Sequence, residues 1–292
     1  MPANAAARPK LGVIGGTGLY AMAGLESAET VDADTPFGKP SAPIVIGEIA
    51  GTRTAFVPRH GVGHRLLPTE IPYLGNVYAL KALGVEHLVS VSAVGSLRED
   101  FAPLHLVIPD QLIDRTRRRR STFFGDGVAA HVGFADPFCP RLSTSLCEAA
   151  RQAGATVHRG GVYVVMEGPA FSTRAESSLY RSWGASVIGM TALPEAKLAR
   201  EAEMCYATLA CVTDYDVWRE SEADVSVEMV VANLQANAQA AQRALHALAA
   251  GLSDERPCAC GGALATAIAT NPAHIGVEAR ERLAPIIGKY IA

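Results

Sequence analysis

Short apolar runs alternate with segments of helical periodicity along most of the chain. The runs are rich in valine, isoleucine and leucine, and most stop at glycine or at a small polar residue, which is typical of buried strands. The predicted strands are 10–14, 43–50, 52–58, 87–94, 161–166, 186–190 and 206–212. The pair 43–50 and 52–58 is expected to form a hairpin across Gly51.

The segments between these strands carry helix signals. The predicted helices are 69–83, 141–153, 174–183, 194–203 and a long one capped by Ser226 that runs to about residue 250. Strands that alternate with helices predict one α/β domain around a central sheet, here residues 10–251. Residues 254–262 contain proline and two adjacent glycines and resemble a linker. We therefore expect a helical extension, 252–292, that packs on the same domain.

Composition narrows the class of protein. The chain has 292 residues, 49% of them hydrophobic, and a net charge of −3, so it can build a large core and lacks the basic field that nucleic-acid binding needs. The run Arg117 to Arg120 is interpreted as a solvated loop. No apolar stretch is long enough to span a bilayer, and residues 1–10 do not resemble a secretion signal. We expect a soluble, cytoplasmic protein that acts on small molecules.

The six cysteines are too dilute for a disulfide scaffold. Cys258 and Cys260 form C-x-C rather than C-x-x-C, and no second pair follows at zinc-finger spacing, so we expect no metal site. The other cysteines are interpreted as small buried hydrophobes. Oxidation of Cys258 with Cys260, or pairing of the tail with Cys205, stays open.

A glycine loop, Gly15-Gly16-Thr17-Gly18, directly follows the first predicted strand. Its backbone N–H groups and the Thr17 hydroxyl could hold an anion, but a plain turn would have the same sequence. The loop also fits a degenerate dinucleotide pattern. However, the segment that follows is barely long enough for a crossover helix, so a nucleotide-cofactor fold is a weak alternative.

Polar or small residues also follow the other predicted strands. Arg59 and His60 could bind phosphate, and Ser92-Ala93 and Met190-Thr191 offer hydroxyls and room for a ligand. Since α/β sheets place ligands at strand ends, these segments are expected to share one site.

Asp214 and Asp216 end the most apolar predicted strand. Two carboxylates this close cannot both stay ionised cheaply in a pocket, so one is expected to hold a proton near neutrality, although a simple turn is an equal alternative.

These motifs together resemble the 5′-methylthioadenosine phosphorylase branch of the purine nucleoside phosphorylase family. The matching stretches keep one order over residues 10–250 and are 12–19, 34–41, 59–61, 93–99, 110–116, 137–140, 167–176, 190–191, 194–195 and 213–218. The resemblance implies a central mixed β-sheet flanked by helices, and the C-x-C tail resembles the C-terminal extension of some microbial members. Ser92, Val94 and Ala170 depart from frequent family residues, and Ala170 puts an ion pair of the family in doubt.

The resemblance also implies roles for individual residues. Phosphate would be held by Thr17, Arg59, His60, Ser92, the backbone at Ala93, and Thr191. Met190 would lie under the ribose, Phe171 would line the base pocket, and Asp214 and Asp216 would face the adenine edge. The 5′-methylthio group would meet Val227, Val230 and Val231, together with His131 from a neighbouring subunit.

The implied reaction is phosphorolysis of 5′-methylthioadenosine to adenine and 5-methylthioribose 1-phosphate, in methionine and purine salvage, with Asp214 as the acid toward N7. It needs no metal or organic cofactor, because inorganic phosphate is the co-substrate. The implied partners are the nucleoside and phosphate, without nucleic acid or membrane, in a homotrimer or a dimer of trimers. The alternatives are a phosphorylase of inosine or guanosine, a nicotinamide-dependent oxidoreductase, and a non-catalytic nucleoside-binding protein.

Overall fold

The computed structural model describes residues 8–16, 19, 25–219, 227–253 and 255–291, without the side chains at 227, 229–232 and 234. In this part of the chain the strands are β1 Leu11–Gly15, β2 Glu26–Val31, β3 Ile44–Ile49, β4 Thr52–Pro58, β5 His87–Ser96, β6 Leu106–Ile108, β7 Gln111–Arg115, β8 Val157–Arg159, β9 Val162–Met166, β10 Ala185–Gly189 and β11 Cys205–Asp214. The helices are α1 Tyr73–Leu83, α2 Pro140–Gln152, α3 Arg174–Ser182, α4 Ala192–Glu201, α5 Val227–Ala250, α6 Val277–Arg282 and α7 Ala284–Ile291, with 3₁₀ turns η2 Ala259–Gly262 and η3 Pro272–His274.

The strands form one mixed sheet in the order β2-β3-β4-β1-β5-β10-β9-β7. A branch leaves this path at β5: β11 pairs with β5, β6 pairs with β11, and β8 pairs with β6. β1, β4, β5 and β11 run parallel, whereas β10 is antiparallel to β5. The carboxyl ends of β1, β4, β5 and β11 therefore lie at one edge of the sheet. The predicted mixed sheet with flanking helices is confirmed.

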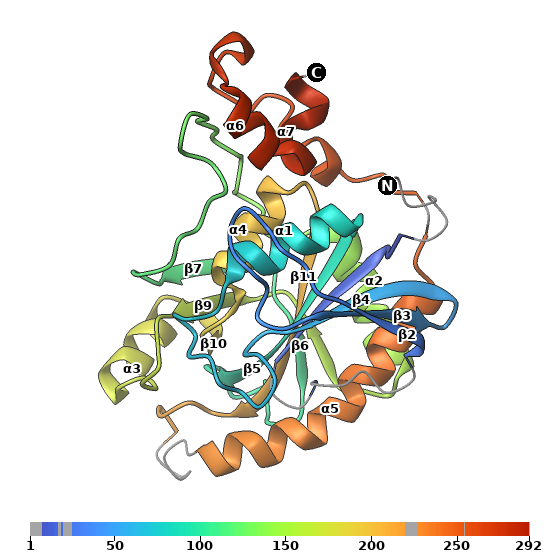
Figure 1. The fold of residues 1–292 in the computed structure, drawn as a ribbon. Coiled ribbons are helices and arrows are strands. Elements are labelled where there is room, and N and C mark those ends of the chain that lie inside the picture. The colour runs from blue at the N-terminus through green and yellow to red at the C-terminus, as the bar shows by residue number, and fades with distance from the viewer. Residues whose placement is uncertain (1–7, 17–18, 20–24, 220–226, 254, 292) are drawn as a thin grey trace.

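Helices cover both faces of the sheet (Figure 1). α2 and α5 pack on one face, where their apolar side chains join those of β11 in one cluster. α1 and α4 pack on the other face, in a second cluster that includes Leu283, Ile286 and Ile287 of the C-terminal segment. That segment is also tied down by polar contacts, because Glu203 accepts from the Leu264 N–H at 2.9 Å and the Tyr78 hydroxyl donates to the Arg282 carbonyl at 2.9 Å. Within the described chain, no helix is both long and apolar enough to cross a membrane.

The predicted strands and helices are present, with shifted ends. The helix predicted from residue 69 starts at Tyr73, because Pro72 biases Ile71 away from the helical region. Strands β2, β6, β7 and β8 were missed. The residues of β2 are mostly exposed and polar and show no apolar alternation. β2 pairs antiparallel with β3, so the chain after the glycine loop returns to this sheet as an edge strand. That placement argues against the dinucleotide-binding unit, in which a crossover helix leads to a parallel strand.

Candidate active site

A cavity of about 550 Å³ lies at the edge where the parallel strands end. It is lined by segments that follow or end β1, β4, β5, β9, β10 and β11: Gly16, Arg59, His60, His64, Leu67, Pro68, Ser92, Ala93, Val94, Gly95, Met166, Pro169, Phe171, Ile188, Gly189, Met190, Thr191, Thr213, Asp214 and Asp216. The strand-end segments singled out in the sequence therefore converge on one cavity, as far as the described residues reach.

One end of the cavity is rich in hydroxyl and cationic groups. Ser92, on the central strand β5, places its Oγ 3.0 Å from Oγ1 of Thr191, which follows β10. Both residues are buried, and each hydroxyl can still donate to or accept from a ligand. Two hydroxyls side by side at the floor of a cavity suit a ligand with several oxygen atoms, such as phosphate.

Arg59 lies beneath these hydroxyls and is only 1% exposed. Its Nε donates to Glu195 Oε1 at 2.6 Å, and its Nη2 donates to Ser90 Oγ at 2.7 Å and to the Ile14 carbonyl at 3.1 Å. Burial alone would oppose the cation, but Glu195 more than compensates, so the pKa of Arg59 is raised. The guanidinium is thereby a fixed positive charge.

One N–H of Arg59 is left to face the glycine loop. Nη1 donates one proton to the Val91 carbonyl at 2.8 Å, and within the described residues no contact uses its second proton. A Cβ on Gly16 would lie only 3.1 Å from Nη1, so glycine lets the loop approach the guanidinium. Glu195 had no predicted role, because a partner 136 residues away leaves no local pattern.

His60 is held in a defined tautomer. Its Nδ1 lies 2.8 Å from the Leu66 carbonyl, which can only accept, so Nδ1 donates and Nε2 keeps a lone pair in the neutral ring. Burial lowers the pKa of His60 to about 4. The ring stacks on His64, with centroids 4.2 Å apart and planes 9° from parallel. His60 therefore enters binding as a neutral group, and His64, which was not assigned to the site, forms part of its wall.

The two aspartates lie at the end of β11. Asp214 Oδ2 accepts from the Thr213 hydroxyl at 2.7 Å, and its Oδ1 accepts from the Asp216 backbone N–H at 2.8 Å. A Cβ on Gly95 would lie 2.9 Å from Asp214 Oδ1, so only glycine leaves room for this carboxylate beside β5. Hydrogen bonds of this kind favour the ionised form of a carboxyl.

Asp216 has a different environment. Its backbone φ of 52° lies in the left-handed region, and its Oδ2 is buried without a hydrogen-bond partner among the described residues. Burial raises the pKa of Asp216, against the opposite effect of the nearby Ser177 and Ser172 hydroxyls. We expected the proton on Asp214 and the charge on Asp216. In the unliganded chain Asp214 accepts two hydrogen bonds and burial raises the pKa of Asp216, and the sharing of the proton in the adenine complex stays a prediction.

The wall between the two ends is apolar and is supported from behind by Arg119. Met190 and Phe171 line the cavity, and the Arg119 guanidinium donates to the carbonyl of Met190. It also donates to the Leu193 carbonyl at 2.7 Å and to the Glu167 carbonyl at 2.7 Å.

The interpretation of the arginine run as a solvated loop is therefore wrong for Arg119, whose side chain is 1% exposed. Arg117 and Arg118 are exposed, as expected. Carbonyl groups contributed by distant segments cannot be seen in the local sequence.

Residues 10–250 match the family model of the phosphorylase superfamily. The chain belongs to the phosphorylase superfamily. It is 56% identical to an S-methyl-5′-thioadenosine phosphorylase of Geobacter sulfurreducens, over 96% of this chain and 99% of that one. It is 57% identical to the protein of the same name from Chloroflexus aurantiacus, over 96% of this chain and 98% of that one.

Solved structures agree with this membership. A methylthioadenosine phosphorylase from an Antarctic soil metagenomic library superposes with a TM-score of 0.91 at 48% identity, over 96% of this chain and 99% of that one. The methylthioadenosine phosphorylase of Schistosoma mansoni, in complex with adenine, gives 0.82 at 35% identity, over 85% of this chain and 93% of that one. The resemblance found in the sequence, to the methylthioadenosine phosphorylase branch and its fold, is confirmed.

Five of the predicted site residues are not among the described residues that line this cavity. Thr17 lies outside the described residues, and α5 carries Val227, Val230 and Val231 at positions whose side chains are not described. His131 is exposed, does not line the cavity of its own chain, and donates its backbone N–H to the Ala267 carbonyl at 2.8 Å. These five assignments, like the ligand roles of the other residues, stay predictions.

Proposed function

We propose that the chain catalyses the phosphorolysis of 5′-methylthioadenosine, giving adenine and 5-methylthioribose 1-phosphate. The observation that carries this proposal is the polarity of one cavity: hydroxyls and Arg59 at one end, a carboxyl pair at the other, and an apolar wall between them. The names of the relatives and the complexes of the Schistosoma mansoni protein with adenine and with methylthioadenosine support it.

Phosphate would bind at the hydroxyl end. We assign its oxygens to Ser92, Thr191, the backbone at Ala93, the Nη1 group of Arg59 and Thr17. The Nε2 atom of neutral His60 would accept a hydrogen bond from the P–O–H group of monohydrogen phosphate. A phosphate oxygen then forms the bond to C1′ while the C1′–N9 bond breaks, and the nearby anion stabilises the cationic character of the sugar.

Adenine would bind at the carboxyl end, with Phe171 along the base and Met190 under the ribose. The orphaned Oδ2 of Asp216 is a suitable acceptor for a 6-amino N–H. That hydrogen bond would favour the ionised form of Asp216 and shift the shared proton toward Asp214, which would deliver it to N7 as the base leaves. The raised pKa of Asp216 in the unliganded chain is thus compatible with Asp214 as the acid in the complex.

The methylthio group would lie against the first turns of α5. This helix is fixed to the end of β11, where the Asn237 side chain donates to the Val212 carbonyl at 2.9 Å and the Asn233 side chain donates to the Thr213 carbonyl at 2.5 Å. The assignment of Val227, Val230 and Val231 to an apolar pocket comes from the family resemblance, and the anchoring of α5 beside Asp214 supports it. With His131 coming from a neighbour, we infer a homotrimer or a dimer of trimers.

The rest of the proposal concerns the setting of the reaction. Phosphorolysis at C1′ uses phosphate as the co-substrate and, we infer, no metal or organic cofactor. We also propose that residues 10–251 form the phosphorylase domain and that 252–292 is an extension packed on it. A role in methionine and purine salvage and a cytoplasmic location stay predictions from the sequence.

A substrate panel tests the assignment. The purified chain should release adenine from methylthioadenosine only when phosphate is added, and without nicotinamide cofactors. Methylthioinosine and inosine should be poor substrates, because their 6-oxo group would face the Asp216 carboxylate, acceptor against acceptor. Preference for inosine would indicate a general purine nucleoside phosphorylase, and binding without turnover would indicate a nucleoside-binding protein.

A further inference from the structure

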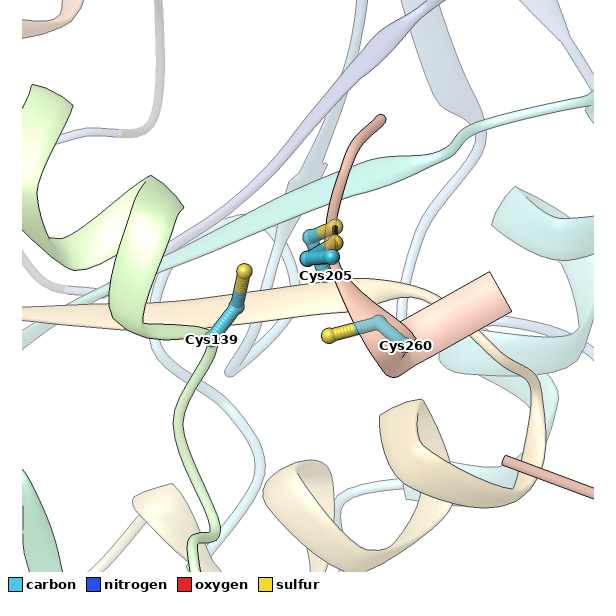
Figure 2. Close-up of side chains that lie close together, drawn as sticks. Cys139, Cys205 and Cys260 are labelled. Carbon is cyan, nitrogen blue, oxygen red and sulfur yellow. Dashed lines mark hydrogen bonds between the residues drawn. The ribbon is translucent and has the colours of Figure 1, made fainter. Parts of the chain in front are cut away.

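Four cysteine sulfurs meet on the side of the sheet opposite the active-site edge. The Sγ atoms of Cys139, Cys205, Cys258 and Cys260 all lie within 4.8 Å of one another. Cys139 caps the N-terminus of α2, Cys205 begins β11, and the other two come from the segment at η2. Figure 2 shows the side chains of Cys139, Cys205 and Cys260 converging from these separate parts of the chain.

The spacing of the sulfurs fits ligands around one ion. Zinc–sulfur bonds of about 2.3 Å in a tetrahedral site place the sulfurs roughly 3.8 Å apart. Here Cys205 Sγ and Cys258 Sγ are 3.3 Å apart, and no cysteine in the structure is joined in a disulfide. Every sulfur of the cluster is near the other three, whereas two disulfides would need only two close pairs.

The surroundings suit thiolates. Cys139, Cys205 and Cys260 are buried and Cys258 is half-buried, so the sulfurs are largely shielded from water. The Leu142 backbone N–H donates to Cys139 Sγ at 3.5 Å, and Arg256 Nη2 donates to Cys205 Sγ at 3.6 Å. An N–H donor and a guanidinium would partly balance the charge of four thiolates.

We propose that Cys139, Cys205, Cys258 and Cys260 form a tetrathiolate site for a thiophilic divalent cation, with Zn²⁺ as the occupant. Binding replaces four S–H bonds with four S–Zn bonds and releases four protons to solvent, without electron transfer. All four positions are filled by protein, so the ion has no open position for a substrate. Its role is structural: it fastens the segment at 258–260 to α2 and β11.

The site is remote from the chemistry. Cys205 and Asp214 are the first and last residues of β11, nine steps along an extended strand, or roughly 30 Å apart. The expectation of no metal was based on the lack of a second C-x-x-C pair. The fold instead supplies the other two ligands as single residues, Cys139 and Cys205, which precede Cys258 by 53 or more positions in the sequence.

Metal content and spectroscopy of the intact protein test the proposal. Full-length protein purified under reducing conditions without chelators, then offered Zn²⁺, should hold one zinc per chain. Replacement by Co²⁺ should give the intense visible d–d bands of tetrahedral cobalt and sulfur-to-cobalt charge-transfer absorption in the near ultraviolet. Removal of the metal should lower Tm by several degrees.

Matched variants locate the ligands. Cys139→Ser and Cys260→Ser should lose the ion, whereas Cys147→Ser, on the same helix as Cys139, and Cys211→Ser, on the same strand as Cys205, should keep it. If a ligand variant fails to fold, the cobalt spectrum of the wild type decides.

Two results would overturn the proposal. One is reduced wild-type protein that takes up neither Zn²⁺ nor Co²⁺ with sulfur-ligand absorption. The other is freshly isolated protein that is four hydrogens lighter and resists thiol alkylation until reduced, which would make the cluster a pair of disulfides.

Discussion

The two ends of β11 are built for opposite purposes. At its start, Cys205 is one of four converging sulfurs that are largely shielded from water and close to N–H donors. At its end, Asp214 and Asp216 border an open cavity, with an orphaned carboxylate oxygen and a left-handed backbone. At the first end four sulfurs lie within 4.8 Å of one another, whereas at the second end both aspartates line a cavity that a ligand can enter. Among the described residues, buried polar atoms without a partner occur near both ends, at His87 Nδ1 and Arg256 Nε beside Cys205 and at Asp216 Oδ2, so the cavity is what marks the functional end of the strand.

The largest effect is expected at the open end. Asp214→Asn keeps the shape of the side chain but removes the acid, and should lower kcat for methylthioadenosine by roughly 10²–10⁴-fold. The loss should be smaller for 6-oxo nucleosides, because an amide can donate to either N7 or O6. Steady-state kinetics on both substrate types would measure this, and an unchanged kcat for methylthioadenosine would contradict the assignment of the acid.

A site residue could be predicted from the sequence when the feature that marks it lies in its local sequence, and not when it depends on a distant segment. Ser92, Thr191 and Asp214 were found because each follows an apolar strand, and strand ends meet at one edge of a sheet. The role of Glu195 and the burial of Arg119 were missed, because the partners of these residues lie at least 46 residues away in sequence. The surroundings of the two aspartates were also not predicted, since hydrogen-bond donors and burial are defined only by the folded backbone.

Arg119 allows a second test, of stability rather than chemistry. Arg119→Met would leave buried carbonyls behind the Met190 wall without their donor, so the free energy of unfolding should fall by about 3 kcal/mol or more. Arg118→Met is the matched control in the same run, since Arg118 is exposed, and should stay within about 0.5 kcal/mol of wild type. Denaturant unfolding would compare the two variants. Equal free energies of unfolding would show that the hydrogen bonds of Arg119 to these carbonyls are dispensable.

The pH dependence of stability gives a third test, at His60. Its folded pKa of about 4 is below the ordinary value of 6.5, so the unfolded chain binds the additional proton between these pH values. The stability that His60 contributes is therefore present above pH 6.5 and is lost as the pH falls toward 4.

A His60→Gln variant should have a shallower fall in the free energy of unfolding over this window than wild type. The exposed His274 supplies the control variant His274→Gln. If wild type and His60→Gln had parallel pH profiles, the ring would not be buried as a neutral donor.

The smallest effect on turnover is expected at the closed end. Replacing both Cys258 and Cys260 with serine should leave kcat and KM near wild type at moderate temperature, because the cluster is roughly 30 Å from Asp214 along β11. The same variant should unfold at a lower temperature. A hundredfold loss of kcat in folded protein would mean that the two ends of the strand are not independent.

The most direct test of the central claim is the fate of isotopically labelled inorganic phosphate in a reaction with methylthioadenosine. Phosphorolysis predicts one labelled 5-methylthioribose 1-phosphate for each adenine released, and loss of both products in Asp214→Asn. Adenine released together with unlabelled free sugar would instead indicate attack by water, and would contradict the placement of phosphate at Ser92, Thr191 and Arg59.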